Sequence, residues 1–198
     1  MCSPLTTLAL RYASLGARYL TLTHTCHNAF GDSCTPSEPL HSGLSTFGHD
    51  LISELNRLGV LVDVSHTSNS TASDAILASR APVIFSHSSS KALFDHPRNV
   101  EDSVLRLFSE PNPNWKGHGR GTERGAAWKE RDGLVAATAV PAFIGLNGTV
   151  EDVADHIEHL ASVVGKHRVG LGTDFDGYRE DPPKGLEDVS TYPKLVSD

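Results

Sequence analysis

The sequence predicts an α/β protein, an incomplete (β/α)8 barrel of the TIM type with about five βα units. Short apolar stretches alternate with helical ones along the chain, and two of these stretches, residues 60–66 and 82–87, end in a Ser-His pair. A helix separates them, so we expect parallel neighbouring strands with His66 and His87 at one carboxyl edge. In a barrel, catalytic and metal-binding groups collect at that edge.

The first predicted elements are a helix, a strand and a long loop. Ser3 and Pro4 are typical of a helix start, and Gly16 of a helix end. The apolar residues between them recur at helical spacing: Leu5, Leu8, Tyr12 and Leu15. Residues 17–24 then predict a strand that closes on a histidine, and residues 25–45 form a polar loop rich in Gly, Pro, Ser and Thr.

The middle of the chain predicts two further helices and two further strands. The amphipathic pattern of residues 47–58 indicates a helix that Gly59 ends. The strand of residues 60–66 follows, then a helix over 71–78 and the strand of residues 82–87. This order of elements is that of consecutive βα units.

The last part of the chain adds two strands. A short helix is predicted over 104–108, and the Pro-, Gly-, Arg- and Lys-rich residues 110–131 indicate a surface insertion. Residues 133–140 predict the fourth strand. An amphipathic helix with a threonine cap covers 149–164, and residues 168–174 predict the fifth strand.

Strand count alone leaves two architectures open. A doubly wound open sheet needs only about five strands, whereas a closed barrel has eight and about 250 residues. The chain opens inside a helix, so we interpret residues 1–198 as one partial domain, the last five-eighths of a barrel.

Composition excludes several classes of function. The net charge is −7 and the basic residues form no run, which argues against nucleic-acid binding. No apolar run approaches the roughly 20 residues that span a bilayer, and residues 1–15 lack the pattern of a signal peptide. The location stays open, and the cytoplasm is compatible with these features.

Four residues at predicted strand ends suggest metal-dependent hydrolysis. They are His24, His66, His87 and Asp174. Imidazoles and carboxylates bind zinc, which lowers the pKa of a bound water until hydroxide can attack an amide carbonyl. An aspartate could transfer the proton, and an arginine such as Arg98 could bind a substrate carboxylate. Each residue taken singly also has a purely structural interpretation, and Asp176 competes with Asp174 for the catalytic role.

Several segments together resemble one family, the membrane (renal-type) dipeptidases. They occur in family order: residues 18–28, RYLTLTHTCHN; 62–66, VDVSH; 82–90, PVIFSHSSS; 96–100, HPRNV; 172–177, GTDFDG; and 185–193, GLEDVSTYP. The resemblance covers essentially the whole chain apart from residues 110–131. It implies a di-zinc peptidase on a β/α barrel that cleaves dipeptides and that forms homodimers in many members.

The resemblance also implies roles for individual residues. His66 and His87 correspond to the ligands of one zinc ion. His24 corresponds to a histidine that binds substrate and polarises the oxygen of the transition state. Arg98 corresponds to the arginine that binds the substrate carboxylate, and Asp174 to the aspartate that binds substrate and transfers a proton.

The sequence departs from the family pattern in its metal ligands. The His-x-Asp motif of the first zinc and the glutamate shared by both metals are absent from it. Ligands for at most one zinc are partly present, so we expect this chain alone to be impaired in zinc-dependent dipeptide hydrolysis. A non-catalytic pseudoenzyme, or a fragment that associates with an intact subunit, is the alternative hypothesis. The third hypothesis is a different barrel hydrolase of the amidohydrolase type. The Arg98 segment argues against it, because a group that binds a carboxylate fits a peptide-like substrate.

Overall fold

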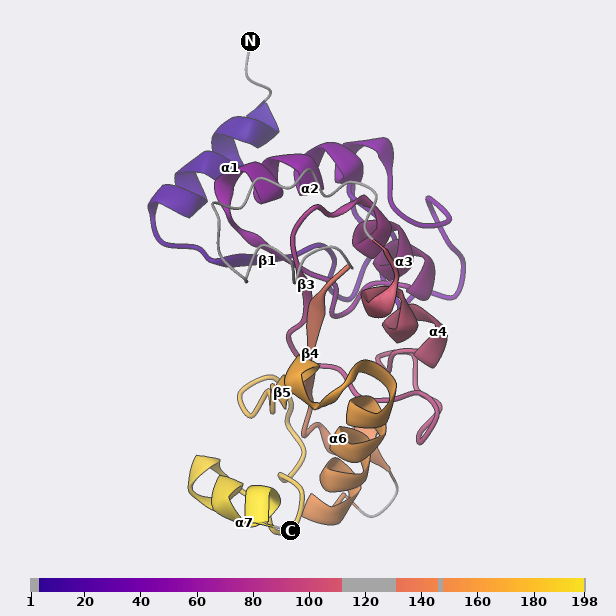
Figure 1. Cartoon of the computed structure of the whole chain (residues 1–198), viewed down its shortest axis with the longest axis vertical. Coiled ribbons are helices and arrows are strands. Elements are labelled where there is room, and N and C mark those ends of the chain that lie inside the picture. Colours follow the sequence, from indigo (N-terminus) through magenta and orange to yellow (C-terminus); the bar gives the residue numbers. More distant parts are fainter. Residues whose placement is uncertain (1–3, 112–130, 146–147, 198) are drawn as a thin grey trace. The chain divides into compact units, whose positions relative to one another are not determined.

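A computed structural model describes residues 4–111, 131–145 and 148–197 (Figure 1). The chain divides into two compact units, and each is described by itself. Unit 1 consists of residues 1–84 and 106–133, and unit 2 of residues 85–105 and 134–198. Most of the predicted insertion, residues 112–130, lies outside the described residues.

Unit 1 is built on parallel strands joined by helices. Its elements are α1 (Pro4–Ser14), β1 (Tyr19–Thr21), α2 (Thr46–Leu58), β2 (Leu61–Asp63), α3 (Asn69–Ala78), the start of β3 (Val83–Phe85) and the 3-10 helix η1 (Arg106–Ser109). Tyr19 pairs with Leu61, and Val62 pairs with Val83, both in parallel register. Parallel pairing across a helical connection defines βα units, as the sequence predicts.

Unit 2 repeats the parallel arrangement. Its elements are α4 (Asp102–Leu105), β4 (Gly133–Ala137), α5 (Pro141–Ile144), α6 (Val150–Val164), the 3-10 helix η3 (Lys166–Arg168), β5 (Val169–Leu171), the 3-10 helix η4 (Val189–Thr191) and α7 (Tyr192–Ser197), although Gly133 itself belongs to unit 1. Val135 pairs with Val169 in parallel register. Helix α6 packs against β5 and also contacts α4, α5 and α7.

The predicted boundaries of α2, α3 and α6 agree with the structure to within about two residues, the usual uncertainty of helix ends. The helix predicted over 104–108 is instead α-helical over Asp102–Leu105 and continues as the 3-10 helix η1. Helix α2 begins after Ser45, whose side chain accepts a hydrogen bond from the Gly48 amide. It ends at Gly59, which has a φ of 72°. Helix α3 begins at Asn69, two residues before the predicted start, because Ser68 caps it by accepting from the Thr71 amide.

The strands are shorter than predicted. They span three residues each in β1, β2, β3 and β5, and five in β4. The prediction was wrong about their ends because apolar composition continues after the backbone has turned. His66, with a φ of 67°, and Asp174, with a φ of 61°, lie in turns that leave the strand. The chemically active residues therefore follow the strands and do not belong to them.

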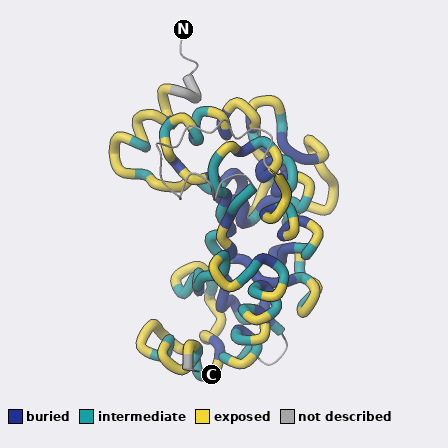
Figure 2. The backbone as a smooth tube through the Cα atoms, in the orientation of Figure 1, coloured by how far each residue is buried: buried dark blue, intermediate teal, exposed yellow. Residues whose placement is uncertain are grey.

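Buried hydrophobic residues occur in β2, β3 and β4 and on one side of helices such as α2, whereas β1 and β5 contain no buried residue. Figure 2 colours the backbone by this burial. Helix α2 buries Leu51, Ile52 and Leu55 in unit 1. In unit 2 the buried core cluster consists of Ala139, Ile144, Val153 and Leu186.

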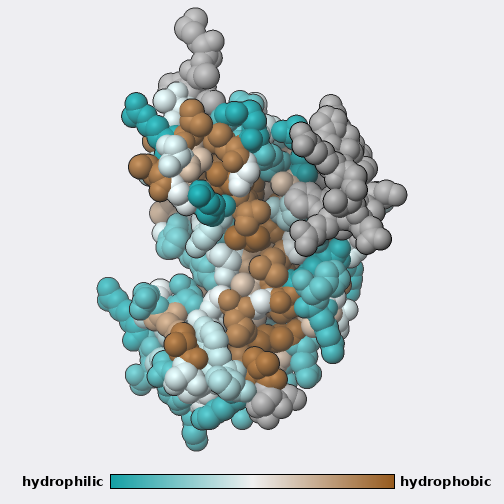
Figure 3. Space-filling view, turned by 60° about the vertical axis from the view of Figure 1, so that its left-hand side comes forward, coloured by the Kyte–Doolittle hydropathy of each residue, from teal (hydrophilic) through white to brown (hydrophobic). Residues whose placement is uncertain are grey.

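Exposed apolar side chains gather around α1 in unit 1 (Figure 3). They are Leu8, Leu10, Tyr12, Leu15 and Tyr19. A cavity of about 280 Å³ lies beside them between α1, β1 and α2. None of the helices in the described part of the chain is long and apolar enough to cross a membrane.

Replacing Thr149 with Ala tests the start of α6. The Thr149 side chain accepts from the Asp152 amide, and the Asp152 carboxylate accepts from the Thr149 amide, which forms a capping box. We expect the T149A change to lower the free energy of unfolding by about 1 kcal/mol, the usual value of such a cap. Urea denaturation measures it, with Thr191→Ala as a control outside the cap. Equal losses in both variants would contradict this assignment.

His156 should make the stability of unit 2 depend on pH. Its ring is 1% exposed, its Nδ1 accepts from the Ser90 amide, and its Nε2 lies 3.0 Å from the Ile144 carbonyl oxygen. Burial lowers the pKa of His156 below its ordinary value, with smaller opposing effects that include the nearby Asp152. The folded protein therefore binds this proton less readily than the unfolded chain, and stability falls as the pH drops below about 6.5.

The measurement is the unfolding free energy of the wild type and of His156→Gln between about pH 8 and pH 5. We expect the advantage of the wild type to shrink as the pH falls. His167→Gln, at an exposed histidine of the same unit, serves as the control. A constant difference between wild type and H156Q across this range would refute the linkage.

Candidate active site

His24 and His66 form a stacked pair in unit 1. His24 lies three residues after β1, and His66 three residues after β2. Their ring centroids are 4.0 Å apart with an angle of 25° between the planes. Because β1 and β2 are parallel and in register, both rings emerge at the same edge of the strand pair. The structure thus brings together two of the predicted site residues.

The backbone of His66 is held from both sides in its left-handed conformation. Its carbonyl oxygen accepts a hydrogen bond from the Thr23 hydroxyl at 3.2 Å and from the Cys34 amide at 2.9 Å. Left-handed backbone is uncommon outside glycine and is tolerated best by Asn, Asp and His. Contacts from the neighbouring turn thus fix a conformation that aims the imidazole.

A buried carboxylate supports the same turn. Asp63 is fully buried at the end of β2. One of its oxygens accepts from the Thr21 hydroxyl at 2.7 Å, and the other accepts from the Ser65 amide at 3.0 Å. These bonds tie the ends of β1 and β2 together directly before the two histidines. A charged residue within an otherwise apolar strand was the signal in the sequence that could have identified it.

His87 and Asp174 are neighbours in unit 2. His87 Nε2 lies 3.9 Å from Asp174 Oδ2, and the two side chains are 18% and 33% exposed. The other ring nitrogen, Nδ1, lies 2.8 Å from the Ser86 hydroxyl. An imidazole beside a carboxylate, each partly open to solvent, can hold and transfer a proton.

Two glycines permit this approach. A side chain at Gly172 would clash with the carbonyl oxygen of Ser86, and one at Gly177 would clash with the carboxylate of Asp174. The Gly177 amide instead donates to the Asp174 carbonyl oxygen at 2.8 Å. Only residues without a Cβ let the turn after β5 close over Asp174 and approach the end of β3.

Arg98 is largely buried in unit 2 and is not a solvated loop residue. It is 8% exposed, and its guanidinium carbon lies 5.4 Å from the centre of the Phe143 ring. Its Nη2 donates to the His87 carbonyl oxygen at 3.1 Å. The arginine is thereby fixed to the segment that carries His87, with an aromatic face beneath its charge.

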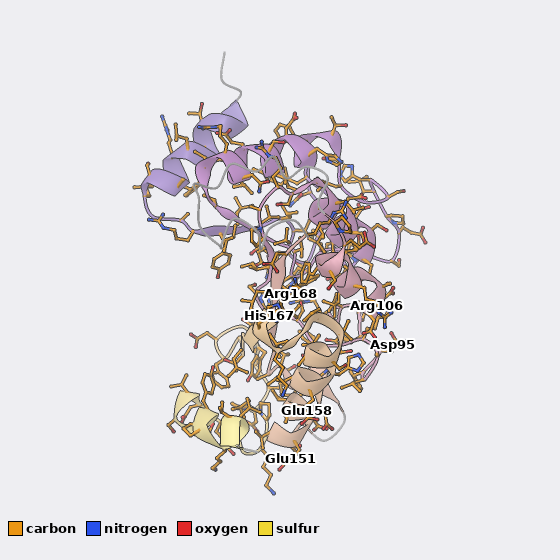
Figure 4. The ribbon with its side chains drawn as sticks, in the orientation of Figure 1. Asp95, Arg106, Glu151, Glu158, His167 and Arg168 are labelled. Atoms are coloured by element: carbon orange, nitrogen blue, oxygen red, sulfur yellow. The ribbon has the colours of Figure 1, made fainter. Side chains whose placement is uncertain are left out.

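His96 completes the surroundings of Arg98. It stacks on Phe143 with ring centroids 4.5 Å apart, and its Nδ1 accepts from the Arg98 amide at 3.2 Å. Burial and the Arg98 charge lower the pKa of His96, and the exposed Asp95, labelled in Figure 4, opposes them. A neutral His96 suits both the accepted hydrogen bond and the adjacent guanidinium.

The donor atoms suit zinc in kind but not in number. Histidine nitrogen and aspartate oxygen are zinc ligands, and a catalytic zinc site takes three protein ligands. Within residues 4–111, 131–145 and 148–197, no group of three His, Cys, Asp or Glu side chains is placed to hold a metal ion. These residues therefore do not make a complete metal site.

The sequence matches a known family of hydrolases. The family described as membrane dipeptidase (peptidase family M19) matches residues 4–112 and 126–198. The chain therefore belongs to the membrane dipeptidase family. It is 43% identical over 191 residues to dipeptidase aclJ of Aspergillus oryzae, a match that covers 94% of this chain and 40% of that protein. The chain thus spans less than half the length of this relative.

Solved structures confirm the fold class. An amidohydrolase from Pseudomonas aeruginosa superposes with a TM-score of 0.76 at 26% identity, covering 96% of this chain and 59% of the other. A metallo peptidase from Rhodobacter sphaeroides, liganded with a phosphinate mimic of the dipeptide L-Ala-D-Ala, superposes with a TM-score of 0.74 at 28% identity. This match covers 96% of this chain and 51% of the metallo peptidase. These matches confirm the predicted incomplete (β/α)8 barrel. They do not support the alternative architecture, a doubly wound open sheet.

Replacing Gly177 with Ala should displace Asp174 from His87. The added methyl group would meet the Asp174 carboxylate, whereas at Gly170 it would make ordinary contact with Leu134 at 3.8 Å. We expect G177A to shift the imidazole NMR signals of His87, which His87→Gln identifies, and expect G170A to leave them unchanged. Identical spectra for wild type and G177A would show that this glycine does not set the position of Asp174.

Proposed function

We propose that the protein acts in the zinc-dependent hydrolysis of dipeptides, as a metallo-dipeptidase, and that this chain supplies groups that contact the substrate but is impaired in turnover when alone. The observation that carries the proposal is the coincidence of family membership with two histidine-containing groups at strand ends. The metallo peptidase that resembles this chain in fold holds a mimic of a dipeptide.

Arg98 is the proposed binding group for the substrate carboxylate. Burial against Phe143 and the bond to the His87 carbonyl oxygen keep the guanidinium in one place. A fixed planar guanidinium can bind a carboxylate through two parallel hydrogen bonds. Such a group selects substrates with a free carboxyl terminus, which every dipeptide has.

His24 and Asp174 are the proposed catalytic and substrate-binding residues. His24 is exposed and stacks on His66, so its ring is oriented yet accessible. It can donate a hydrogen bond to the carbonyl oxygen as negative charge develops there. Asp174, close to His87 and partly exposed, can take a proton and return it to the leaving amine.

His66 and His87 are the proposed zinc ligands of this chain. When bound, zinc lowers the pKa of its water and so supplies the nucleophile for amide hydrolysis. Two imidazoles need at least one more ligand. Zinc and the two-metal arrangement known in the family remain proposals for this protein, as does its assembly into a homodimer.

Residues 1–198 are proposed to form one partial catalytic domain, interrupted by a surface insertion at 110–131. The family match leaves a gap between residues 112 and 126, which supports the insertion. A non-catalytic chain that associates with an intact subunit is the second candidate. What favours it is that no three metal-binding side chains gather within the described residues.

Zinc binding and turnover, measured on one sample, separate these candidates. We expect His66→Ala and His87→Ala each to weaken zinc binding by more than the roughly 10- to 100-fold that changes outside the ligand shell cause, because a ligand itself is lost. His49→Ala, at an exposed histidine, is the control. Elemental analysis and calorimetry measure zinc, and release of free amino acids measures turnover.

Unchanged zinc binding in H66A and H87A would overturn the ligand assignment. Absence of turnover together with stable association with an intact subunit would establish the non-catalytic candidate. Turnover that disappears on chelation and returns with zinc would establish the dipeptidase.

Arg98→Ala should remove the preference for a free carboxylate. Hydrogen bonds between charged groups contribute about 1.5–3 kcal/mol, so we expect binding of a dipeptide to weaken about 10- to 100-fold. Binding of the same dipeptide with an amidated carboxyl terminus should change little. Arg80→Ala, at an exposed arginine, serves as the control. Equal weakening for both ligands in R98A would rule out the proposed carboxylate contact.

A further inference from the structure

The loop between β1 and α2 in unit 1 is organised around one buried carboxylate. Asp32 is 1% exposed. Its side-chain oxygens accept hydrogen bonds from three backbone amides: Leu40 at 2.9 Å, His41 at 3.0 and 3.1 Å, and Gly43 at 3.1 Å. The carboxylate therefore folds the second half of the loop back onto the first.

The backbone of Asp32 joins this loop to the start of α3. Its amide lies 3.2 Å from the Gly43 carbonyl oxygen and 3.0 Å from the Thr71 hydroxyl oxygen. Its carbonyl oxygen accepts from the amide of Ser68, the residue that caps α3, at 2.9 Å. The turn after β2, which carries His66, ends at this cap, so the loop after β1 and the turn after β2 are tied together at Asp32.

The next two residues contact the backbone of both stacked histidines. The Ser33 hydroxyl donates to the His24 carbonyl oxygen, and the Cys34 amide donates to the His66 carbonyl oxygen at 2.9 Å. Ser33 also forms an antiparallel bridge with Thr67. The position of the chain at Asp32 therefore determines where these two donors lie.

The charge of Asp32 is balanced mainly by backbone amide donors. His27 Nδ1 lies 3.2 Å from Asp32 Oδ1 and also accepts from the Ser33 amide at 3.0 Å. Burial alone would raise the pKa of Asp32. The amides of His41, Leu40 and Gly43, with a smaller contribution from nearby His27, outweigh burial and keep the pKa of Asp32 below its ordinary value.

We propose that Asp32 is a positioning residue for the His24–His66 pair. By accepting from three amides of the loop, it holds Ser33 and Cys34 where they fix the backbone of both histidines. That this positioning matters for catalysis rests on the proposed function. The geometry itself concerns how the two imidazoles are held.

Asp32→Asn tests the proposal with minimal change in shape. The amide has one carbonyl oxygen in place of two carboxylate oxygens, so it cannot accept from all three backbone donors, and its NH2 group faces other donors. Asp50→Asn, at an exposed position of α2, is the control for the same change in charge. Ser33→Ala is a second, milder variant that removes only the contact to His24.

The readout is the set of imidazole proton signals in NMR spectra, with those of His24 and His66 identified by His24→Gln and His66→Gln. Stacking shifts these signals through the ring current. We expect D32N to move the signals of both histidines toward the positions of an unstacked imidazole. S33A should move the His24 signals more than those of His66, and D50N should move neither set. The backbone amide signals of α2, which lies in the same unit as Asp32, report whether unit 1 of the variant is still folded.

Unchanged His24 and His66 signals in D32N would overturn the proposal. If D32N unfolds, S33A decides instead: a shift at His24 supports the proposal, and no shift overturns it. None of these signals depends on turnover, so an inactive chain would refute the proposed function while leaving the role of Asp32 to be judged by the spectra.

Discussion

The left-handed turn that follows two of the strands is the constraint on which the candidate site depends. His66 has a φ of 67° and Asp174 a φ of 61°, and a non-glycine residue in this region costs about 1–3 kcal/mol. Each turn is held by hydrogen bonds to the carbonyl oxygen of that residue, from Thr23 and Cys34 at His66 and from Gly177 at Asp174. The strained backbone thus projects a side chain that a regular strand would direct elsewhere.

Buried polar groups hold these turns in place through hydrogen bonds. Asp63 ties the ends of β1 and β2, and Asp32 folds the long loop against the start of α3. A buried carboxylate is stable only when its oxygens have donors, and both residues have them. The loop after β1 is consequently an ordered support for His24 and His66, although its composition is that of an ordinary polar loop.

In unit 2 the site residues are positioned by close approach of backbone segments and by aromatic packing. Gly172 and Gly177 leave room where a Cβ would clash, which brings Asp174 to His87. Phe143 lies beneath both Arg98 and His96. An arginine held in this way loses little freedom when it binds a carboxylate, and preorganisation of this kind favours selective binding over general attraction of anions.

The sequence by itself determined the alternation of strands and helices, the helix caps and the residues at the strand ends. Capping and hydrophobic periodicity are local properties, so Gly59 and Thr149 could be assigned without a structure, whereas the Ser45 cap was not identified from the sequence. Only the tertiary structure decided where the strands stop, because the turn at His66 depends on donors from a distant loop.

The same reason explains the residues that the sequence did not reveal. Nothing adjacent to Asp32 distinguishes it from other loop aspartates, and its partners lie 8 to 11 residues away, with a further one at Thr71. Phe143 is 45 residues from Arg98 in the chain yet beneath its charge in the fold. Local sequence pattern identified the candidate active side chains, whereas long-range hydrogen bonds and packing determine how each of them is held.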